Sequence, residues 1–348
     1  LSFPIFFLVI ASGSGLSQGS TALLANALGA NRLDDARRLF AQSLLFAIVA
    51  GLMLSLLGWL AAPWLCQQLG AEGEYLRTVL DYLNVILAGG VFFLLTMILN
   101  AALSAQGTTW VYRNFLIVSF VANALLNPLL MWGFAGIPAL GVSGIALATV
   151  LVQIGGVLFL GSHVRKLPYC ESLRLQDFRP DATLLRRIAG QGIPAALNML
   201  TVALGVFVIT WFVKHFGKEA VAATGIATRI EQVLLLPTIG LNFAVLSLTG
   251  QNNGAGRMDR VAEVWRTCIR YGLTMTLAGG VILFAVRHVA MTWFTHDAQV
   301  IALGGDYLGS SLHKWLCTPL GAGLLHVRKD RIRGVWPLFG DVSLPEDD

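Results

Sequence analysis

Long apolar runs separated by short polar stretches dominate the chain. We count eight such runs, each near the length of about 20 helical residues that crosses a hydrocarbon core of about 30 Å. They cover approximately residues 3–25, 39–64, 84–105, 115–133, 139–161, 193–213, 223–249 and 266–287. Backbone in lipid must satisfy its own hydrogen bonds, so the pattern predicts an all-α integral membrane protein with about eight transmembrane helices.

Three prolines bear on these helices. Pro194 fits the first turn of a helix, where its missing N–H leaves no bond unmade. Pro128 and Pro237 fall inside runs, so we expect kinks there.

Composition supports this class and removes others. The chain is 56% hydrophobic and 12% charged, outside the range of soluble domains. Its four cysteines are scattered without a CxxC spacing, and no metal site is expected. The net charge of +5 is explained by basic loops facing the cytoplasm, so we expect no nucleic-acid partner. The partner expected is the lipid bilayer.

Loop charges predict the orientation. One set of alternate loops holds fourteen basic residues and the other holds four, namely Arg77, Lys214, Lys218 and Arg287. The richer set is expected to face the cytoplasm. It comprises Arg32, Arg37, Arg38, Arg113, Arg165, Lys166, Arg174, Arg179, Arg186, Arg187, Arg257, Arg260, Arg266 and Arg270.

A short motif occurs twice, 225 residues apart. Gly29, Ala30, Arg32 and Asp34 are matched by Gly254, Ala255, Arg257 and Asp259, and Gly250 and Gln251 precede the second copy. The register extends without a gap from Gly15 to Leu83, which indicates duplication of a whole module, as in many transporters. No strand or Gly-Lys-Ser/Thr accompanies the motif, so it is not a phosphate loop. We expect a structural role in a cytoplasmic turn, with gating as the alternative.

The polar segment 163–190 divides the chain into its two halves. We expect an N-terminal bundle over 1–162, a cytoplasmic linker over 163–190 and a partial C-terminal bundle over 191–308. Because residue 1 is Leu and falls on the outer side, one earlier helix is expected to be missing.

Several stretches resemble the multidrug and toxic compound extrusion (MATE) family over residues 1–308. They are Gly192-Ile193-Pro194, Ala222-Ala223-Thr224-Gly225-Ile226-Ala227-Thr228-Arg229-Ile230-Glu231, Asn123-Ala124-Leu125-Leu126-Asn127-Pro128 and the duplicated motif. The resemblance implies two six-helix bundles around a central cleft. It also implies a secondary transporter, not an enzyme, that exports organic cations or amphiphiles against Na⁺ or H⁺ entry. We therefore expect a multi-pass monomer in a bacterial inner (plasma) membrane. On this resemblance the chain begins at the second helix of the family and stops before the tenth, and we expect such a fragment to be inactive.

Asn123 and Asn127 are the first candidates for the substrate or ion site. Four residues apart, they share one helix face. The resemblance implies an Asp in several relatives at the position of Asn127, so the amide here weakens a proton-carrier role. The alternative is that both side chains simply hydrogen-bond between helices.

Arg229 and Glu231 are the second candidates, because they are the charged pair inside a run. Two helical positions separate them by roughly 200°, so they face opposite sides and do not pair with each other. Charges buried in membranes are usually functional, and Glu231 is the better candidate for the coupling ion. The alternative is that both lie near the outer interface.

Residues 309–348 break the duplication and contain no membrane run. Ser310 to Gly323 is similar to the lysine region of class V aminotransferases, with Lys314 at the Schiff-base position. Without the other cofactor-binding parts, no pyridoxal phosphate or other cofactor is expected. We interpret 309–348 as a foreign, non-membrane tail joined at Leu308.

Two other functions stay open. One is a lipid-linked saccharide flippase of the same superfamily, which calls for a basic cleft. The other is a pyridoxal-phosphate enzyme with a membrane anchor. Neither the substrate nor the coupling ion follows from the sequence.

Overall fold

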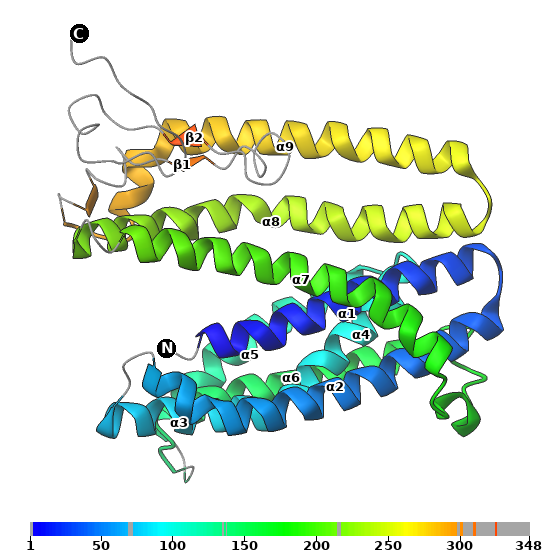
Figure 1. Cartoon of the computed structure of the whole chain (residues 1–348), viewed down its shortest axis with the longest axis horizontal. Coiled ribbons are helices and arrows are strands. Elements are labelled where there is room, and N and C mark those ends of the chain that lie inside the picture. Colours follow the sequence, from blue (N-terminus) through cyan, green and yellow to red (C-terminus); the bar gives the residue numbers. More distant parts are fainter. Residues whose placement is uncertain are drawn as a thin grey trace. The chain divides into compact units, whose positions relative to one another are not determined.

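The computed structural model describes residues 3–68, 72–133, 136, 138–213, 217–297, 300–301, 309–310 and 324–325. These residues are almost entirely helical (Figure 1). The helices are α1 (Phe3–Gly29), α2 (Leu33–Gln68), α3 (Gly73–Ala88), α4 (Gly90–Ala105), α5 (Trp110–Trp132), α6 (Val142–Val164), α7 (Ala182–Val213), α8 (Lys218–Gly254) and α9 (Met258–Thr292). A 3₁₀ helix, η1, covers Leu175–Phe178, and the two-residue strands β1 (Gly309–Ser310) and β2 (Leu324–Leu325) pair antiparallel.

The chain forms two compact units. The first comprises Leu1–Ala203 and Asn242–Trp265, and the second comprises Leu204–Leu241 and Arg266–Asp348. The helices α7, α8 and α9 therefore each contribute to both units. The module boundaries expected at residues 162 and 191 stay predictions.

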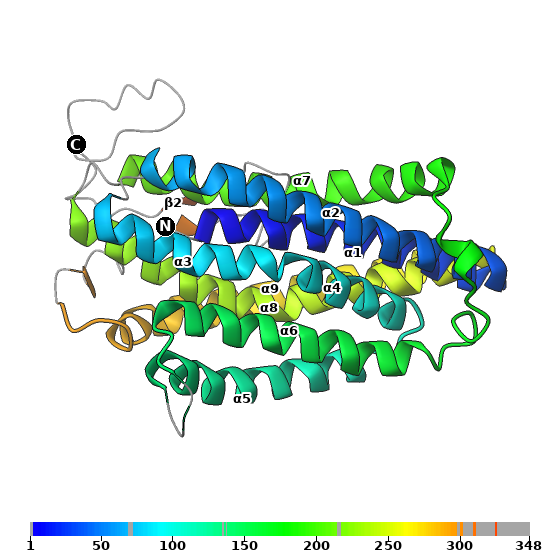
Figure 2. The same ribbon diagram turned by 90° about the horizontal axis from the view of Figure 1, so that it is seen from below.

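The first unit is built around α4, which packs against α1, α2 and α6 (Figure 2). Small residues permit the close approaches, since little hydrophobic effect drives helices together in lipid. A Cβ atom on Gly15 of α1 would lie 2.5 Å from the backbone N of Ala196 in α7. A Cβ atom on Gly51 of α2 would lie 2.8 Å from the Cα of Val91 in α4.

The second unit has its own apolar cluster. Ala223 of α8, Met291 of α9 and Val300 are each at most 5% exposed. Ile226, Ile230 and Ile301 pack against them.

The apolar run expected at 84–105 is a bent pair of helices. α3 and α4 meet at an angle of 44° at Gly89. The hydroxyl of Ser55 in α2 donates to the carbonyl of Leu87 at 2.5 Å, beside the bend. The sequence reading missed α3 because its exposed face is polar, with Glu74, Arg77 and Asp81, which hides the buried face from a hydropathy pattern.

The position expected for Pro194 is wrong. α7 begins at Ala182, so Pro194 lies in the helix interior rather than in its first turn. Oδ1 of Asp181 accepts hydrogen bonds from the backbone N–H groups of Thr183 and Leu184, which makes Asp181 the N-cap. α5 and α8 continue through Pro128 and Pro237.

Among the described residues, α2, α5 and α6 are long and apolar enough to cross a membrane, and the α3–α4 pair adds a fourth span if counted as one. The other four of the eight expected spans correspond to α1, α7, α8 and α9 and stay predictions as spans. The exposed apolar faces of α2 and α5, which carry Trp59, Leu60 and Phe120, suit contact with lipid.

The linker belongs to the first unit and packs against α2. The amide of Gln42, 1% exposed, donates to the carbonyls of Asp177 and Arg179 at 2.8 Å each and accepts from the N–H of Asp181 at 3.1 Å. Arg37 Nε lies 3.1 Å from Oδ2 of Asp177. These contacts bring the linker to the same end of the unit as the basic α1–α2 turn; its cytoplasmic location stays a prediction.

The duplicated motif forms the same turn twice. After α1, Asn31 has φ 56°, and the N–H groups of Asn31 and Arg32 bond to the carbonyls of Leu28 and Ala27. After α8, Gly256 has φ 71°, and Gly256 and Arg257 bond to Asn253 and Asn252. Each pair of bonds is a Schellman motif, and every residue in it has its counterpart 225 positions later.

The charged residues of the motif serve the helices that follow. Asp34 lies in the first turn of α2 and Asp259 in the first turn of α9, where a carboxylate interacts favourably with the helix dipole. Arg32 lies 3.2 Å from Asp35 in an exposed ion pair. Both copies thus form the same turn and place a carboxylate in the first turn of the next helix; the role of the motif stays a prediction.

Candidate functional site

A ladder of polar side chains runs along one face of α5. Ser119, Asn123 and Asn127 follow one another at intervals of four residues. Nδ2 of Asn123 donates to the backbone carbonyl of Ser119 at 3.0 Å. Oδ1 of Asn127 and Oγ of Ser119 are buried and have no hydrogen-bond partner among the described residues.

The antiparallel helix α6 adds a fourth polar group. Near the connection between the two helices, Gly144 packs against the carbonyl of Leu130; farther along, Gly156 packs against the ring of Phe115. This pairing places Gln153 level with Ser119. Oε1 of Gln153 is also buried without a partner in the described part of the chain.

Three buried oxygens without donors require a physical explanation. Leaving such an acceptor unpaired costs about 1–3 kcal/mol. A bound cation or ordered water would satisfy them, and hard cations prefer oxygen ligands. The side chains of the ladder (Ser119, Asn123, Asn127, Gln153) are neutral and do not titrate, so they suit a metal cation or water rather than a stored proton.

The other predicted site residues lie where the structure gives no side chain. Arg229 and Glu231 belong to α8, but their side chains lie outside the described residues. Lys314 lies outside them altogether. Their predicted roles are therefore untested.

Gln153 was missed by sequence reasoning. A single Gln in an apolar helix resembles a residue that bonds between helices, and only the packing of α6 on α5 reveals its unpaired oxygen. The sequence did offer one signal for Gln153, which is a polar side chain in the middle of α6, a helix that has no charged residue before its last turns.

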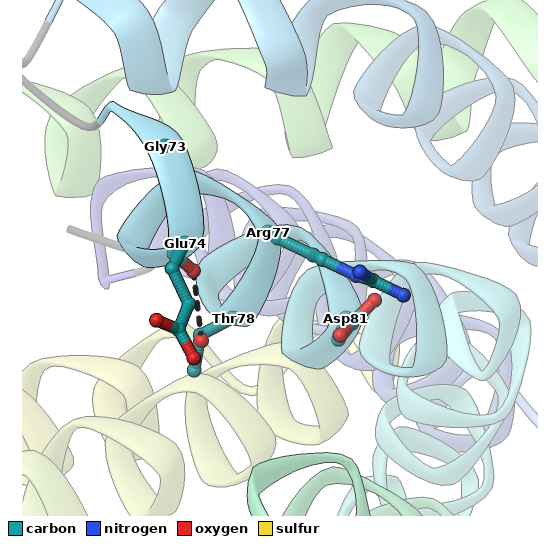
Figure 3. A pocket seen from close by; sticks show the side chains of 5 residues that line it. All are labelled: Gly73, Glu74, Arg77, Thr78 and Asp81. Carbon is teal, nitrogen blue, oxygen red and sulfur yellow. Dashed lines mark hydrogen bonds between the residues drawn. The ribbon is translucent and has the colours of Figure 1, made fainter.

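A surface hollow of about 640 Å³ lies on the N-terminal half of α3 (Figure 3). It is lined by Gly73, Glu74, Arg77, Thr78 and Asp81. Thr78 donates to the carbonyl of Glu74 within the helix at 3.0 Å. Its mixed charges are exposed to solvent, so this hollow does not form a desolvated binding site.

The family is shown by sequence comparison. Residues 1–129 and 194–313 match the family model described as MatE. This match continues past Leu308, and the comparisons lend no support to an aminotransferase-like tail joined at that residue.

Curated relatives agree over most of the chain. A probable multidrug resistance protein, YoeA of Bacillus subtilis, is 28% identical over 322 residues, covering 90% of this chain and 68% of the relative. The probable multidrug resistance protein NorM of Thermotoga maritima is 29% identical, covering 87% and 65%. The multidrug export protein MepA of Staphylococcus aureus (strain NCTC 8325 / PS 47) is 26% identical, covering 92% and 70%. The chain thus spans about two thirds of the length of these relatives.

Solved structures share the fold. An outward-facing multidrug resistance MATE family transporter of the MOP superfamily is 25% identical, with a TM-score of 0.80, covering 88% of this chain and 67% of its own. A MOP superfamily transporter from Pyrococcus furiosus is 24% identical, with a TM-score of 0.77, covering 86% and 66%. These matches confirm an all-α transporter fold and exclude the reading of the chain as an enzyme. The chain therefore belongs to the MatE family, and its fold is that of an integral membrane transporter.

Proposed function

We propose that this protein exports drugs or other organic cations and amphiphiles across a bacterial plasma membrane, in exchange for entry of Na⁺ or H⁺. The names of the relatives support this proposal, since they are described as multidrug resistance or multidrug export proteins. We further propose that it works as a monomer.

The observation that carries the coupling proposal is the set of three unpaired buried oxygens on Asn127, Ser119 and Gln153. Ser119 and Asn127 are eight residues apart, about 12 Å along α5, so the three oxygens are separate places along one polar path rather than the ligands of one ion. A neutral oxygen ligand such as Oδ1 of Asn127 can hold Na⁺ by coordination but offers no base for a proton. The ladder therefore favours Na⁺ at this place. It contains no basic residue, which favours cation handling over the saccharide-flippase alternative.

Glu231 is the alternative coupling residue. A carboxylate in α8 would bind either H⁺ or Na⁺, and Arg229 would need a partner of its own. The two proposals differ in their pH dependence, because only coupling through Glu231 involves a titrating group.

A binding experiment tests the ladder directly. Purified protein is heated in NaCl or in choline chloride at equal ionic strength, and Na⁺ is expected to raise the melting temperature because a ligand stabilises the state that binds it. Asn127→Leu removes one orphaned oxygen and should abolish this shift. Thr149→Val is the matched control, since the Thr149 hydroxyl already bonds to the carbonyl of Ile145 in its own helix at 3.1 Å.

Transport is tested in liposomes with a fluorescent organic cation. An inward Na⁺ gradient should drive its export in the wild-type protein and in Thr149→Val, and should fail to drive it in Asn127→Leu. Export driven by a pH gradient alone, unaffected by Asn127→Leu, would overturn the ladder and leave Glu231 as the coupling residue.

A further inference from the structure

The linker and α8, which are far apart in the sequence, converge on the C-terminal end of α4. The last carbonyl groups of a helix have no partner within it. Here the carbonyl of Ala102 accepts from the Tyr169 hydroxyl at 3.2 Å, and that of Ser104 accepts from the Ser247 hydroxyl at 2.7 Å. The carbonyl of Ala105 accepts from Nε2 of Gln251 at 2.5 Å. The linker and α8 therefore cap α4 together.

α8 reaches α4 by passing very close to α1. A Cβ atom on Gly254 would clash with the backbone carbonyl of Asn26, and one on Gly29 would clash with the backbone carbonyl of Gln251. A Cβ atom on Gly250 would lie 2.7 Å from the Cβ of Ala25. Any larger residue at these glycines would force the two helix ends apart.

The glycine contact is reciprocal. Asn26 and Gln251 are counterparts in the duplication, as are Gly29 and Gly254. Gly29 contacts Gln251, and Gly254 contacts Asn26. The two copies of the motif therefore contact each other through the same surface, as in a two-fold, isologous contact. The duplicated motif is thus used twice in one contact, once from each copy.

The contact belongs to the only part of α8 assigned to the first unit. Lys218–Leu241 belongs to the second unit, and Asn242–Gly254 belongs to the first. Within that C-terminal part, Ser247 and Gln251 supply the side-chain hydrogen bonds to α4 among the residues that the structure describes. Release of these two bonds would free the end of α8 from α4.

We propose that Ser247 and Gln251, with Gly29 and Gly254, form a latch that keeps the end of the protein bearing the basic turns closed. The latch opens when the substrate cleft faces the cytoplasm and closes when it faces outward. This inference rests on the proposed function, since it assigns the latch to the transport cycle. Gln251 acts here as a positioning residue that touches neither substrate nor ion.

The bonds of the latch suit a reversible switch. One neutral hydrogen bond of ordinary strength shifts a two-state equilibrium by about fivefold. The free energy released by binding a ligand is large enough to break both hydrogen bonds. The glycine contacts add shape complementarity, so the closed state re-forms in one register.

A distance measurement tests the latch independently of transport. In the full chain with its native cysteines replaced, spin labels are placed at Leu33→Cys and Met258→Cys, exposed counterparts that begin α2 and α9. The wild-type background should give mainly a short distance. Gln251→Leu and Ser247→Ala should each raise the ratio of long to short distances by about fivefold.

Asn252→Leu is the matched control. Its Nδ2 bonds to the carbonyl of Leu248 in the same helix at 2.8 Å, so its loss should leave the distances unchanged. Unchanged distances in both Gln251→Leu and Ser247→Ala would overturn the latch, whether or not the protein transports. Having two variants protects the test against one that fails to fold.

A cross-link connects the latch to transport. A bifunctional methanethiosulfonate reagent that joins Leu33→Cys to Met258→Cys should stop export in liposomes, and reductant should restore it. Export that continues with the cross-link in place would show that the contact need not open. If the unlinked protein exports nothing, the proposed function fails while the spin-label result still decides whether the latch exists.

Discussion

Asn31 and Gly256 perform the same task with different side chains. Both hold a positive φ, at 56° and 71°, in the turn that ends a helix. Glycine adopts this conformation freely and Asn tolerates it, whereas a residue such as Ala is strained there. The two copies of the motif therefore differ in identity where only backbone conformation matters.

A substitution at Asn31 checks this reading. Asn31→Ala should lower the free energy of unfolding by about 1 kcal/mol. Ala is strained in the left-handed conformation and lacks the local hydrogen bonding that an Asn side chain offers there. Asn31→Gly should be neutral or slightly stabilising. Thermal melts of the detergent-solubilised variants measure both, and equal losses for Ala and Gly would contradict the backbone explanation.

Cys170 provides a chemical test of linker burial. Burial raises the pKa of its thiol to about 12. Because the thiolate is the reactive form, Cys170 should react with a maleimide at pH 8 far more slowly than a cysteine introduced at the exposed neighbour Glu171. The comparison is made with Glu171→Cys in a Cys170→Ala background, and equal rates would show that the linker is not docked.

The raised pKa of the Cys170 thiol also predicts how the stability of the protein depends on pH in alkaline solution. Below pH 9, the ordinary thiol pKa, both folded and unfolded states keep the proton, and the contribution of Cys170 is constant. Between pH 9 and about 12 only the unfolded state loses it, so stability should fall as pH rises through this window. Cys170→Ala should reduce that slope in melts recorded at pH 8, 9 and 10, and an identical slope would contradict it.

At the scale of elements, the linker shows how one buried side chain organises a segment without regular structure. Gln42 makes three hydrogen bonds to the backbone at Asp177, Arg179 and Asp181. Asp177 in turn accepts from the N–H of Arg174 at 2.9 Å, which closes η1. The linker thus has a defined conformation, to which both Gln42 of α2 and the bonds within its own turns contribute.

Loss of Gln42 should release this segment. Gln42→Met keeps the volume but leaves two carbonyls and one N–H unbonded, so we expect a loss of about 2–4 kcal/mol in stability. Trypsin should then cleave faster after Arg174, whereas the bond after Arg179 resists trypsin because Pro180 follows it. Arg38→Gln is the control, because Arg38 is exposed on the same turn of α2; cleavage at the wild-type rate in Gln42→Met would argue against docking.

For the whole molecule, the important property is that helices α7, α8 and α9 each pass from one compact unit into the other. If the protein carries out the proposed transport, a movement between alternating states would be accommodated along these helices. Glu231 lies in α8, in the part assigned to the second unit, and Ser247 and Gln251 lie in the part assigned to the first. One helix thus carries both a candidate coupling residue and the latch.

The role of Glu231 is tested in cells. Glu231→Gln should reduce the drug resistance that the protein confers on a sensitive host while its amount in the membrane stays constant, since the amide preserves shape but cannot take up a coupling cation by charge. Resistance is read as the minimal inhibitory concentration and expression as the membrane-fraction yield. Unaltered resistance would assign Glu231 to the interface.

The sequence by itself determined what depends on local pattern. Apolar runs predict helices because each must close its own hydrogen bonds in lipid, and the repeated motif predicts repeated turns because a helix end is specified by a few neighbouring residues. The duplication, the alternation of basic loops and the family all followed from such patterns. The hidden helix α3 and the start of α7 did not, because their polar residues lie on exposed faces.

Only the tertiary structure decided which polar groups are satisfied and which are not. Gln251 and Ala105 are 146 residues apart, and Gln42 and Arg179 are 137 apart, so no local rule pairs them. The unpaired oxygens of Ser119, Asn127 and Gln153 likewise become visible only when α5 is packed on α6. Burial and long-range approach are properties of the packed helices, and they turn an ordinary amide into a candidate ion ligand or a latch.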